Sequence, residues 1–303
     1  MKVLVCDSIS PRAVERMRNA GLEVDVQDSI TPEELLEAIA PYDAMVVRSR
    51  TKVRKPVIDR ATNLKVIVRG GVGVDNIDVA YAEAKGARIM NTPGASTQAV
   101  AELTIAYLFA LARPIVQATE SMRAGAWEKS KFSGTELAGK VLGIVGMGRI
   151  GAAVAQKAAA LGMLVLGYDS RTVGAEPFMH MVELDELYAK ADFISLHLPL
   201  TESSKHMLNA ETFAKMKKGV RIVDCARGGV IDEDALYDAI GAGQVAGAAL
   251  DVFENEPLTD RRLFELPQVI GSPHIGAGTK EATARIGDEV ADVLIRVCQE
   301  PCN

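Results

Sequence analysis

The chain has 303 residues, of which 48% are hydrophobic and 24% charged, and this length is sufficient for about two globular domains with separate cores. Its formal charge of −6 argues against a surface that neutralises nucleic-acid phosphates or anionic lipid. The four cysteines show neither a CxxC spacing nor a cluster with histidine, so we expect reduced structural thiols and no metal site.

The N-terminus leads directly from Met1 into a predicted strand at residues 2–6. It shows neither the basic leader nor the apolar segment of a signal peptide, and no apolar stretch reaches the length of a membrane span. We therefore expect a cytoplasmic protein.

The first ninety residues alternate predicted strands and helices with short connections, as a parallel α/β layer does. Ser10-Pro11 begins a helix that Gly21 ends, and Thr31-Pro32-Glu33-Glu34 forms a capping box with proline at the first helical position. Another helix is expected near residues 79–85. Strands are expected at residues 2–6, 22–27, 44–47, 64–68 and 88–90. These elements predict one flavodoxin-like domain.

A long, largely apolar helix is expected at residues 96–111, and Asn91-Thr92-Pro93-Gly94 before it is typical of a crossing between domains. Residues 112–140 are less regular and contain the one tryptophan of the chain, Trp127. This segment either wraps its own domain or packs against a second subunit.

The stretch from residue 141 to residue 169 indicates a dinucleotide site. An apolar strand leads into Gly146-Met147-Gly148-Arg149-Ile150-Gly151, a small-residue helix and a second strand follow, and Asp169 ends the unit. The first glycine permits a tight turn, the second lets the backbone approach a pyrophosphate, and the third lets helix and strand pack closely. A glycine-rich turn alone is a weak signal, but an acid 21 residues after Gly148 fits this context. Because that carboxylate would repel a 2′-phosphate, NAD is favoured over NADP.

The strand–helix alternation continues to the end of the chain, and we expect further strands at residues 163–168, 193–197, 220–225, 246–252 and 269–271. With residues 141–145 these make a six-stranded doubly wound sheet, a Rossmann domain. The last helix, residues 279–299, has no strand of its own, and we infer that it returns to the first domain. The expected substrate domain is therefore 1–93 with 279–303, and the NAD-binding domain inserted into it is 94–278.

Three polar residues follow predicted strands on the carboxyl side, where open α/β sheets bind ligands. Arg227 has a planar fork that suits a carboxylate and an adjacent oxygen, His274 is a candidate proton donor and acceptor, and Glu256 would stabilise its imidazolium form. Together they suit hydride transfer between NAD and a 2-hydroxy acid. The alternatives are a packed turn histidine, a solvated glutamate and an arginine paired with Asp224.

Several motifs, taken together, closely resemble the D-isomer-specific 2-hydroxyacid dehydrogenases, and the resemblance runs over essentially the whole chain. They are Gly146 to Gly151, His197-Leu198-Pro199-Leu200, Cys225-Ala226-Arg227-Gly228-Gly229, Asp251-Val252-Phe253 with Glu256-Pro257, and Pro273-His274-Ile275-Gly276.

This resemblance implies roles for further residues. Arg227 would bind substrate, and Glu256 and His274 would be the catalytic acid–base pair. The backbone amides of Arg149 and Ile150 would face the pyrophosphate. The other implied cofactor neighbours are His197, Pro199, Cys225, Ala226, Asp251 and Gly276. The turn of Gly70, Gly71 and Val72 would offer N–H groups to the substrate carboxylate. A homodimer through the NAD-binding domain, with the Trp127 region in the contact, is also implied.

Within this family, Val47-Arg48-Ser49, the run from Arg69 to Asn76 and Asn91-Thr92-Pro93 are most similar to members that act on a phosphorylated three-carbon acid. We expect oxidation of D-3-phosphoglycerate to 3-phosphohydroxypyruvate, the first step of serine biosynthesis, with Arg48 and Arg69 reaching the substrate. The local basic cluster also contains Arg50, Lys52, Arg54 and Lys55, for which a solvated loop is the alternative.

Two other functions remain open at this point. One is a relative that acts on an unphosphorylated acid, such as a glyoxylate or hydroxypyruvate reductase. The other is an NAD(H)-sensing binding protein of the same fold. Longer family members carry a C-terminal serine-binding domain, and because the sequence ends at Asn303 we expect none here.

Overall fold

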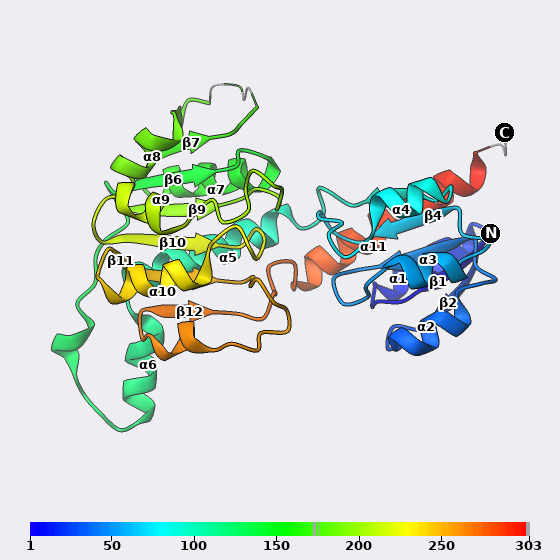
Figure 1. The fold of residues 1–303 in the computed structure, drawn as a ribbon, viewed down its shortest axis with the longest axis horizontal. Coiled ribbons are helices and arrows are strands. Elements are labelled where there is room, and N and C mark those ends of the chain that lie inside the picture. The colour runs from blue at the N-terminus through cyan, green and yellow to red at the C-terminus, as the bar shows by residue number, and fades with distance from the viewer. Residues whose placement is uncertain (172–173, 175, 301–303) are drawn as a thin grey trace. The chain divides into compact units, whose positions relative to one another are not determined.

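The computed structural model describes residues 1–171, 174 and 176–300 and divides the chain into two compact units. The first unit comprises Met1–Thr97 and the chain from Ala277 onward, and the second is Gln98–Gly276. The blue-to-cyan strands of Figure 1 belong to the first unit, and the green-to-orange strands belong to the second.

The first unit is built on a five-stranded parallel sheet in the order β2-β1-β3-β4-β5. Its strands are β1 (Lys2–Val5), β2 (Glu23–Val26), β3 (Ala44–Val47), β4 (Val66–Arg69) and β5 (Arg88–Asn91). Its helices are α1 (Pro11–Asn19), α2 (Pro32–Ala38), α3 (Lys55–Arg60), α4 (Val79–Ala84) and α11 (Lys280–Gln299). This strand order is that of flavodoxin-like folds, as the sequence predicted.

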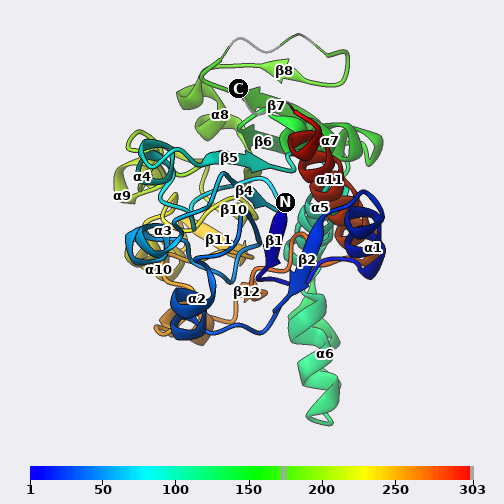
Figure 2. The ribbon, with the colours of Figure 1, turned by 90° about the vertical axis from the view of Figure 1, so that its right-hand side faces the viewer.

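Helices cover both faces of this sheet, which is why β1, β3 and β4 are almost continuously apolar. One core cluster joins the strands to α1 and α11, and the other joins them to α2, α3 and α4 (Figure 2). The terminal helix α11 packs on α1, where Arg16 pairs with Asp288 at 3.0 Å and with Asp292 at 2.6 Å. The sequence analysis missed α3, a six-residue helix whose N-cap residue, Arg54, makes no side-chain capping bond.

The second unit contains a seven-stranded sheet in the order β12-β11-β10-β9-β6-β7-β8, with parallel pairing throughout the described strands. Its strands are β6 (Val141–Val145), β7 (Leu164–Tyr168), β8 (His180–Met181), β9 (Phe193–Leu196), β10 (Val220–Asp224), β11 (Val245–Leu250) and β12 (Val269–Gly271). The order reverses between β6 and β9, as in the doubly wound dinucleotide-binding fold.

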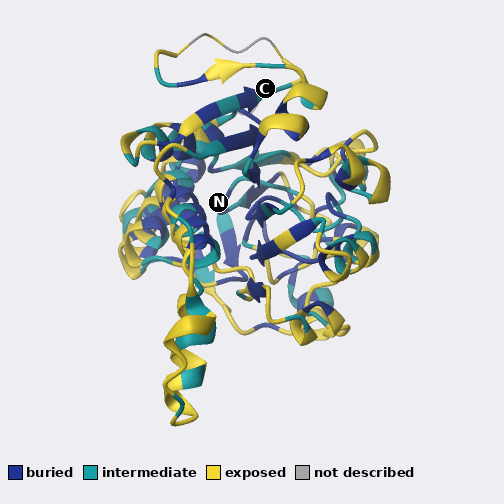
Figure 3. Cartoon of the chain, turned by 90° about the vertical axis from the view of Figure 1, so that its left-hand side faces the viewer, coloured by how far each residue is buried: buried dark blue, intermediate teal, exposed yellow. Residues whose placement is uncertain are grey.

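Strands β6, β9, β10 and β11 of this sheet are largely buried between two helical layers, and Figure 3 draws buried residues dark blue. One core cluster contains buried residues of α8, α9 and α10, and the other contains those of α5 and α7. These helices are α5 (Thr97–Ala112), α7 (Arg149–Ala160), α8 (Leu184–Lys190), α9 (Ala210–Lys215) and α10 (Glu233–Gly241). The predicted fold class, two doubly wound parallel sheets with a Rossmann domain inserted into a flavodoxin-like one, is confirmed.

One prediction for this unit, the number of strands, was wrong. The sheet has seven strands rather than six, because His180 and Met181, which lie outside every predicted strand, form the two-residue strand β8 beside β7. Both residues of β8 are exposed, so no apolar pattern marks it. The segment expected to be less regular contains one helix, α6 (Ile115–Arg123), and a 3₁₀ turn, η1 (Lys129–Phe132).

Helix α6 extends away from the sheet of its own unit and has no buried residue (Figures 1 and 2). No single helix in the described part of the chain is long and apolar enough to cross a membrane. Helices α5 and α6 reach that length only as a pair, and a bend of 66° separates them.

Candidate active site

The turn from β6 into α7 contains the three glycines of the dinucleotide motif, and each has a different environment. Gly146 has φ +96°, and a Cβ there would lie 2.4 Å from the His197 carbonyl oxygen. A Cβ on Gly151 would lie 2.0 Å from the Gly146 carbonyl oxygen. A Cβ on Gly148, the N-cap of α7, would meet nothing within 4 Å. The turn thus leaves open backbone at a helix N-terminus, which suits a pyrophosphate.

The crowded Gly151 is therefore expected to matter for folding, and the open Gly148 for cofactor binding. Gly151→Ala will destabilise the protein by about 1–3 kcal/mol or more, because its methyl group clashes with fixed backbone. Gly148→Ala will leave the melting temperature near the wild-type value, and we expect it to weaken NAD(H) binding by about tenfold or more, because its methyl group would occupy the open space expected to receive the pyrophosphate. Thermal unfolding and NADH fluorescence titration will measure both effects. Wild-type affinity in folded Gly148→Ala would contradict this assignment.

Asp169 follows β7 and is almost inaccessible, with its side chain 6% exposed. Its carboxylate accepts from the backbone N–H groups of Met147 (2.8 Å) and Arg171 (2.9 Å) and pairs with the Arg171 guanidinium at 3.2 Å. Burial by itself would raise the pKa of Asp169, but these donors outweigh it and the pKa is lowered. The group is therefore a fixed anion beside the glycine turn, the charge expected to favour NAD over NADP.

His274 and Glu256 lie within hydrogen-bond distance, with His274 Nδ1 2.7 Å from Glu256 Oε2. Since a carboxylate only accepts, Nδ1 carries a proton and Nε2 is the nitrogen left to exchange protons with a substrate. His274 has φ +54°, a left-handed conformation that is costly for a residue with a Cβ. Its N–H donates to the Asp251 carbonyl at 2.9 Å.

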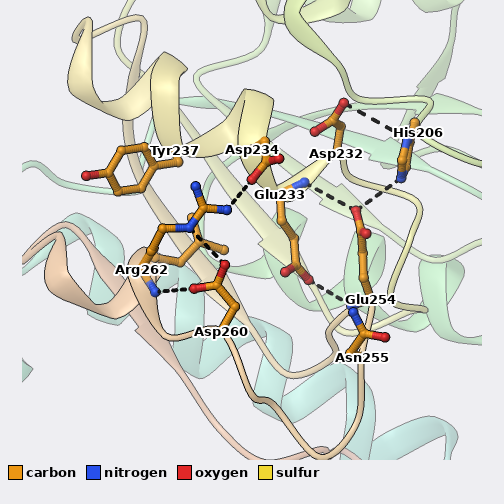
Figure 4. A pocket seen from close by; sticks show the side chains of 10 residues that line it. His206, Asp232, Glu233, Asp234, Tyr237, Glu254, Asn255, Asp260 and Arg262 are labelled. Atoms are coloured by element: carbon orange, nitrogen blue, oxygen red, sulfur yellow. Dashed lines mark hydrogen bonds and ion pairs between the residues drawn. The ribbon is translucent and has the colours of Figure 1, made fainter.

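The segment that carries Glu256 is anchored by Glu233 of α10 and by His206, which lies in the turn between β9 and α9. Glu254 N–H donates to Glu233 at 2.7 Å, and His206 Nε2 lies 3.0 Å from Glu254 Oε1 (Figure 4). Glu256 also accepts from Phe253 N–H at 3.3 Å, and its peptide bond to Pro257 is cis. These contacts fix the backbone that presents the Glu256 carboxylate.

Arg227 follows β10 in a turn that lies against the segment carrying Glu256. A Cβ on Gly228 would lie 1.8 Å from the Phe253 carbonyl oxygen, so only glycine permits this approach. Arg227 Nη1 donates to the Ala226 carbonyl at 2.5 Å. The buried Asp224 accepts from Ala226 N–H at 2.8 Å, and the charge of Arg227 acts on it.

Burial raises the pKa of Asp224 to about 7, although the Ala226 N–H and the Arg227 charge oppose the rise. As pH rises, the unfolded chain ionises near its ordinary value and the folded state only near 7, so Asp224 costs stability progressively between these values. Asp224→Asn will therefore raise the free energy of unfolding by about a few kcal/mol at pH 8 and by little at pH 4. Urea unfolding of both proteins at the two pH values tests this, and an equal gain at both would contradict it.

Other predicted cofactor neighbours follow the strands β9, β10 and β12 along the chain. His197 follows β9, its Nε2 is 2.8 Å from Ser195 Oγ, and burial lowers its pKa to about 3. Its Nδ1 is buried without a hydrogen-bond partner among the described residues. Pro199 is exposed, and burial raises the pKa of the Cys225 thiol well above its usual range. Gly276 donates its N–H to Asp251 Oδ2 at 2.7 Å.

In the first unit, the predicted substrate residues gather at the carboxyl ends of β3 and β4. Arg69 ends β4, and a Cβ on Gly71 would lie 1.4 Å from Arg69 Nη1, so this glycine makes room for the arginine. Arg48 follows β3, and its Nη1 makes one 3.3 Å bond, to the Ser8 carbonyl. Burial lowers the pKa of its guanidinium. A cationic side chain that is half-buried here suits an anionic ligand.

Arg50 differs from Arg48 because its guanidinium is already bound by several other groups of the protein. Its Nε pairs with the buried Asp7 at 2.9 Å, and its Nη atoms donate to the carbonyls of Cys6, Asp28 and Ile30. Asp7 also accepts from Arg48 N–H at 2.5 Å and from Thr51 Oγ1 at 2.9 Å. The sequence analysis missed this network. The one sequence signal for it is an acid, Asp7, two residues after the end of β1, together with the basic residues after β3.

Comparison with known proteins identifies relatives along the whole chain. The family model for the D-isomer specific 2-hydroxyacid dehydrogenase, NAD binding domain, matches residues 105–276. A D-3-phosphoglycerate dehydrogenase of Methanocaldococcus jannaschii is 48% identical over 301 residues, which cover 98% of this chain and 57% of the relative. A hydroxypyruvate reductase of Thermotoga maritima is 46% identical over 299 residues, 97% of each chain.

Among solved structures, the D-lactate dehydrogenase of Aquifex aeolicus complexed with NAD and lactic acid has a TM-score of 0.87 and 30% identity. The alignment covers 99% of this chain and 96% of that one. The chain spans just over half the length of the curated D-3-phosphoglycerate dehydrogenases that it matches.

Proposed function

We propose that this chain, which belongs to the family of D-isomer-specific 2-hydroxyacid dehydrogenases, oxidises D-3-phosphoglycerate to 3-phosphohydroxypyruvate with NAD. The acid–base pair of His274 and Glu256, 2.7 Å apart, carries the proposal of a dehydrogenase. The two arginines at the strand ends, Arg48 and Arg69, carry the proposal of a phosphorylated substrate.

The residues at the ends of β6 and β7 fit NAD, as the open backbone at Gly148 and the anionic Asp169 indicate. When bound, NAD accepts the hydride from C2 of the substrate. The amides of Arg149 and Ile150, in the first turn of α7, would hold the pyrophosphate charge. Asp251 and the backbone of Cys225 and Ala226 would line the nicotinamide.

The chain's own residues then bind the acid and move its proton. Arg227 holds the carboxylate and the neighbouring C2 oxygen with its planar fork. His274 Nε2 accepts the proton of the C2 hydroxyl, and the Glu256 carboxylate at Nδ1 stabilises the imidazolium that results. The N–H groups of Gly70, Gly71 and Val72 would bind the carboxylate. Arg48 and Arg69 would bind the phosphate.

A substrate panel tests the function. Catalytic efficiency is to be compared for D-3-phosphoglycerate and D-glycerate with NAD and with NADP, and for hydroxypyruvate and glyoxylate with NADH. We expect the highest efficiency with the phosphorylated acid and NAD. Equal or better turnover of hydroxypyruvate would favour a reductase, the function named for the relative that this chain matches over 97% of its length. NADH binding without turnover of any acid would favour a cofactor-sensing binding protein.

Arg48→Ala and Arg69→Ala will each raise the KM for D-3-phosphoglycerate by about 10–100-fold, because each removes one charge-assisted contact to the phosphate. The KM for hydroxypyruvate, which has no phosphate, will change by less than about threefold. Arg54→Ala is the matched control, since Arg54 is exposed and donates to the Asp75 carbonyl. Unchanged KM values for the phosphorylated acid in both variants would exclude these arginines as its ligands.

We also propose that the chain forms a homodimer through the segment from residue 113 to residue 140. Trp127 is 82% exposed there, and Ile115 and Met122 are more than half exposed. A second subunit would bury this apolar surface. Sedimentation equilibrium tests this, and a monomer mass at micromolar concentration would refute it.

A further inference from the structure

A chain of hydrogen bonds connects helix α5 to the carboxyl end of β11. The Tyr107 hydroxyl lies 2.5 Å from Ser272 Oγ, and Ser272 Oγ lies 2.5 Å from Asp251 Oδ1. Asp251 is 1% exposed and Tyr107 is 8% exposed. The catalytic steps derived above use neither hydroxyl.

The donor and the acceptor in each of these two hydrogen bonds follow from the chemistry of the three groups. An ionised carboxylate only accepts, so Ser272 donates its one proton to Asp251. Tyr107 must then donate to Ser272 Oγ, because the serine has no second proton to give. Burial raises the pKa of Tyr107 to about 12, so its phenol stays a donor at any pH at which an enzyme of this kind is assayed.

Asp251 in turn holds the segment that presents His274. Its Oδ1 accepts from Ile275 N–H at 2.8 Å, its Oδ2 accepts from Gly276 N–H at 2.7 Å, and its carbonyl accepts from His274 N–H at 2.9 Å. The histidine is thus clamped on both sides in its left-handed conformation, which costs energy and persists only where neighbouring bonds enforce it.

We propose that Tyr107 and Ser272 are positioning residues that orient the Asp251 carboxylate and, through it, the backbone of His274. The inference rests on the proposed dehydrogenase function but not on which 2-hydroxy acid is the substrate. A carboxylate with a fixed rotamer can bond two successive N–H groups with its two oxygens, whereas a rotated carboxylate loses one of them. Geometric precision at the proton acceptor is a condition for fast transfer.

Tyr107→Phe removes the hydroxyl and keeps the ring in place. We expect kcat to fall by about fivefold, the factor that one buried hydrogen bond typically represents, with KM for NAD and for the acid changed by less than about twofold. A merely structural loss would instead lower the melting temperature and leave kcat per folded molecule unchanged. Tyr42→Phe is the matched control, because Tyr42 is buried in the first unit and its hydroxyl also donates to a carboxylate, Asp25, at 2.8 Å.

A double-mutant cycle makes the test independent of the size of the single effect. In the Asp251→Asn background, Tyr107→Phe and Ser272→Ala should lower kcat by less than about twofold, since the carboxylate they orient is gone. Full effects in that background, or wild-type kcat in folded Tyr107→Phe, would overturn the inference. If the protein does not turn over D-3-phosphoglycerate, the proposed substrate is wrong but this inference is still testable. The cycle is then run with whichever acid the wild-type protein turns over.

Discussion

Replacement of His274 by asparagine will lower kcat by about 10²–10⁴-fold, the usual contribution of a positioned acid–base group. Asparagine tolerates the left-handed conformation that His274 adopts, so the variant isolates the loss of imidazole from backbone strain. The KM for NAD will change by less than about threefold, because the substitution leaves the glycine turn proposed to bind NAD unchanged. Steady-state kinetics with the preferred acid from the substrate panel measures both constants.

His206 provides a closely matched control for this variant. It is the other described histidine with a left-handed backbone, φ +48°, and its Nε2 also pairs with a glutamate, Glu254, at 3.0 Å. His206→Asn will lower kcat by no more than about threefold, because His206 makes only one of several contacts that hold the segment carrying Glu256, and the hydrogen bonds of Glu254 N–H and Phe253 N–H remain. If the two variants lost activity equally, the proton would have to move through another group and the assignment of His274 would fail.

The fold was predictable where burial imposes a pattern on the sequence. Strands such as β3 and β6 lie between two helical layers, so nearly every residue in them is apolar and the runs stand out. Capping residues marked helix starts, and Thr31 indeed caps α2 with the predicted box. The exposed two-residue strand β8 and the unburied helix α6 carry no such pattern, since neither contributes to a core.

The sequence analysis could name candidate site residues where one residue type has a distinctive chemistry after a strand, as Asp169, Arg227 and His274 have, and their roles stay predictions. It did not find the two hydroxyl groups that we propose to position His274. Tyr107 occurs in an apolar helix where an aromatic ring normally means core packing, and Ser272 is one serine before a proline. Their partnership spans 165 residues of sequence and depends on how α5 packs against the sheet, which no local pattern encodes.

Replacement of Arg227 by glutamine will lower kcat/KM by about 10²–10³-fold, because the charge-assisted hydrogen bonds proposed from this guanidinium to the substrate carboxylate and to the C2 oxygen are lost. Lysine at this position will recover only part of the loss, since an ammonium group is a point charge without the fork that binds two oxygens together. NADH affinity, measured by fluorescence titration, will stay within about threefold in both variants. If Arg227→Lys kept the wild-type kcat/KM, the positive charge alone would be required and the role of the planar fork would be wrong.

Arg221, in the strand that Arg227 follows, provides the control for this variant. Arg221 is in β10, its Nε donates to the Leu111 carbonyl at 3.2 Å, and its guanidinium lies 5.4 Å from the centre of the Phe193 ring. It is the second residue of the strand that Arg227 follows, so Arg221→Gln removes a half-buried arginine near the amino end of β10, at the other end of the strand from Arg227. This variant will lose stability by about 1 kcal/mol and keep its kcat/KM. Loss of kcat/KM in Arg221→Gln to the same extent would mean that β10 as a whole, rather than the Arg227 guanidinium, limits the reaction.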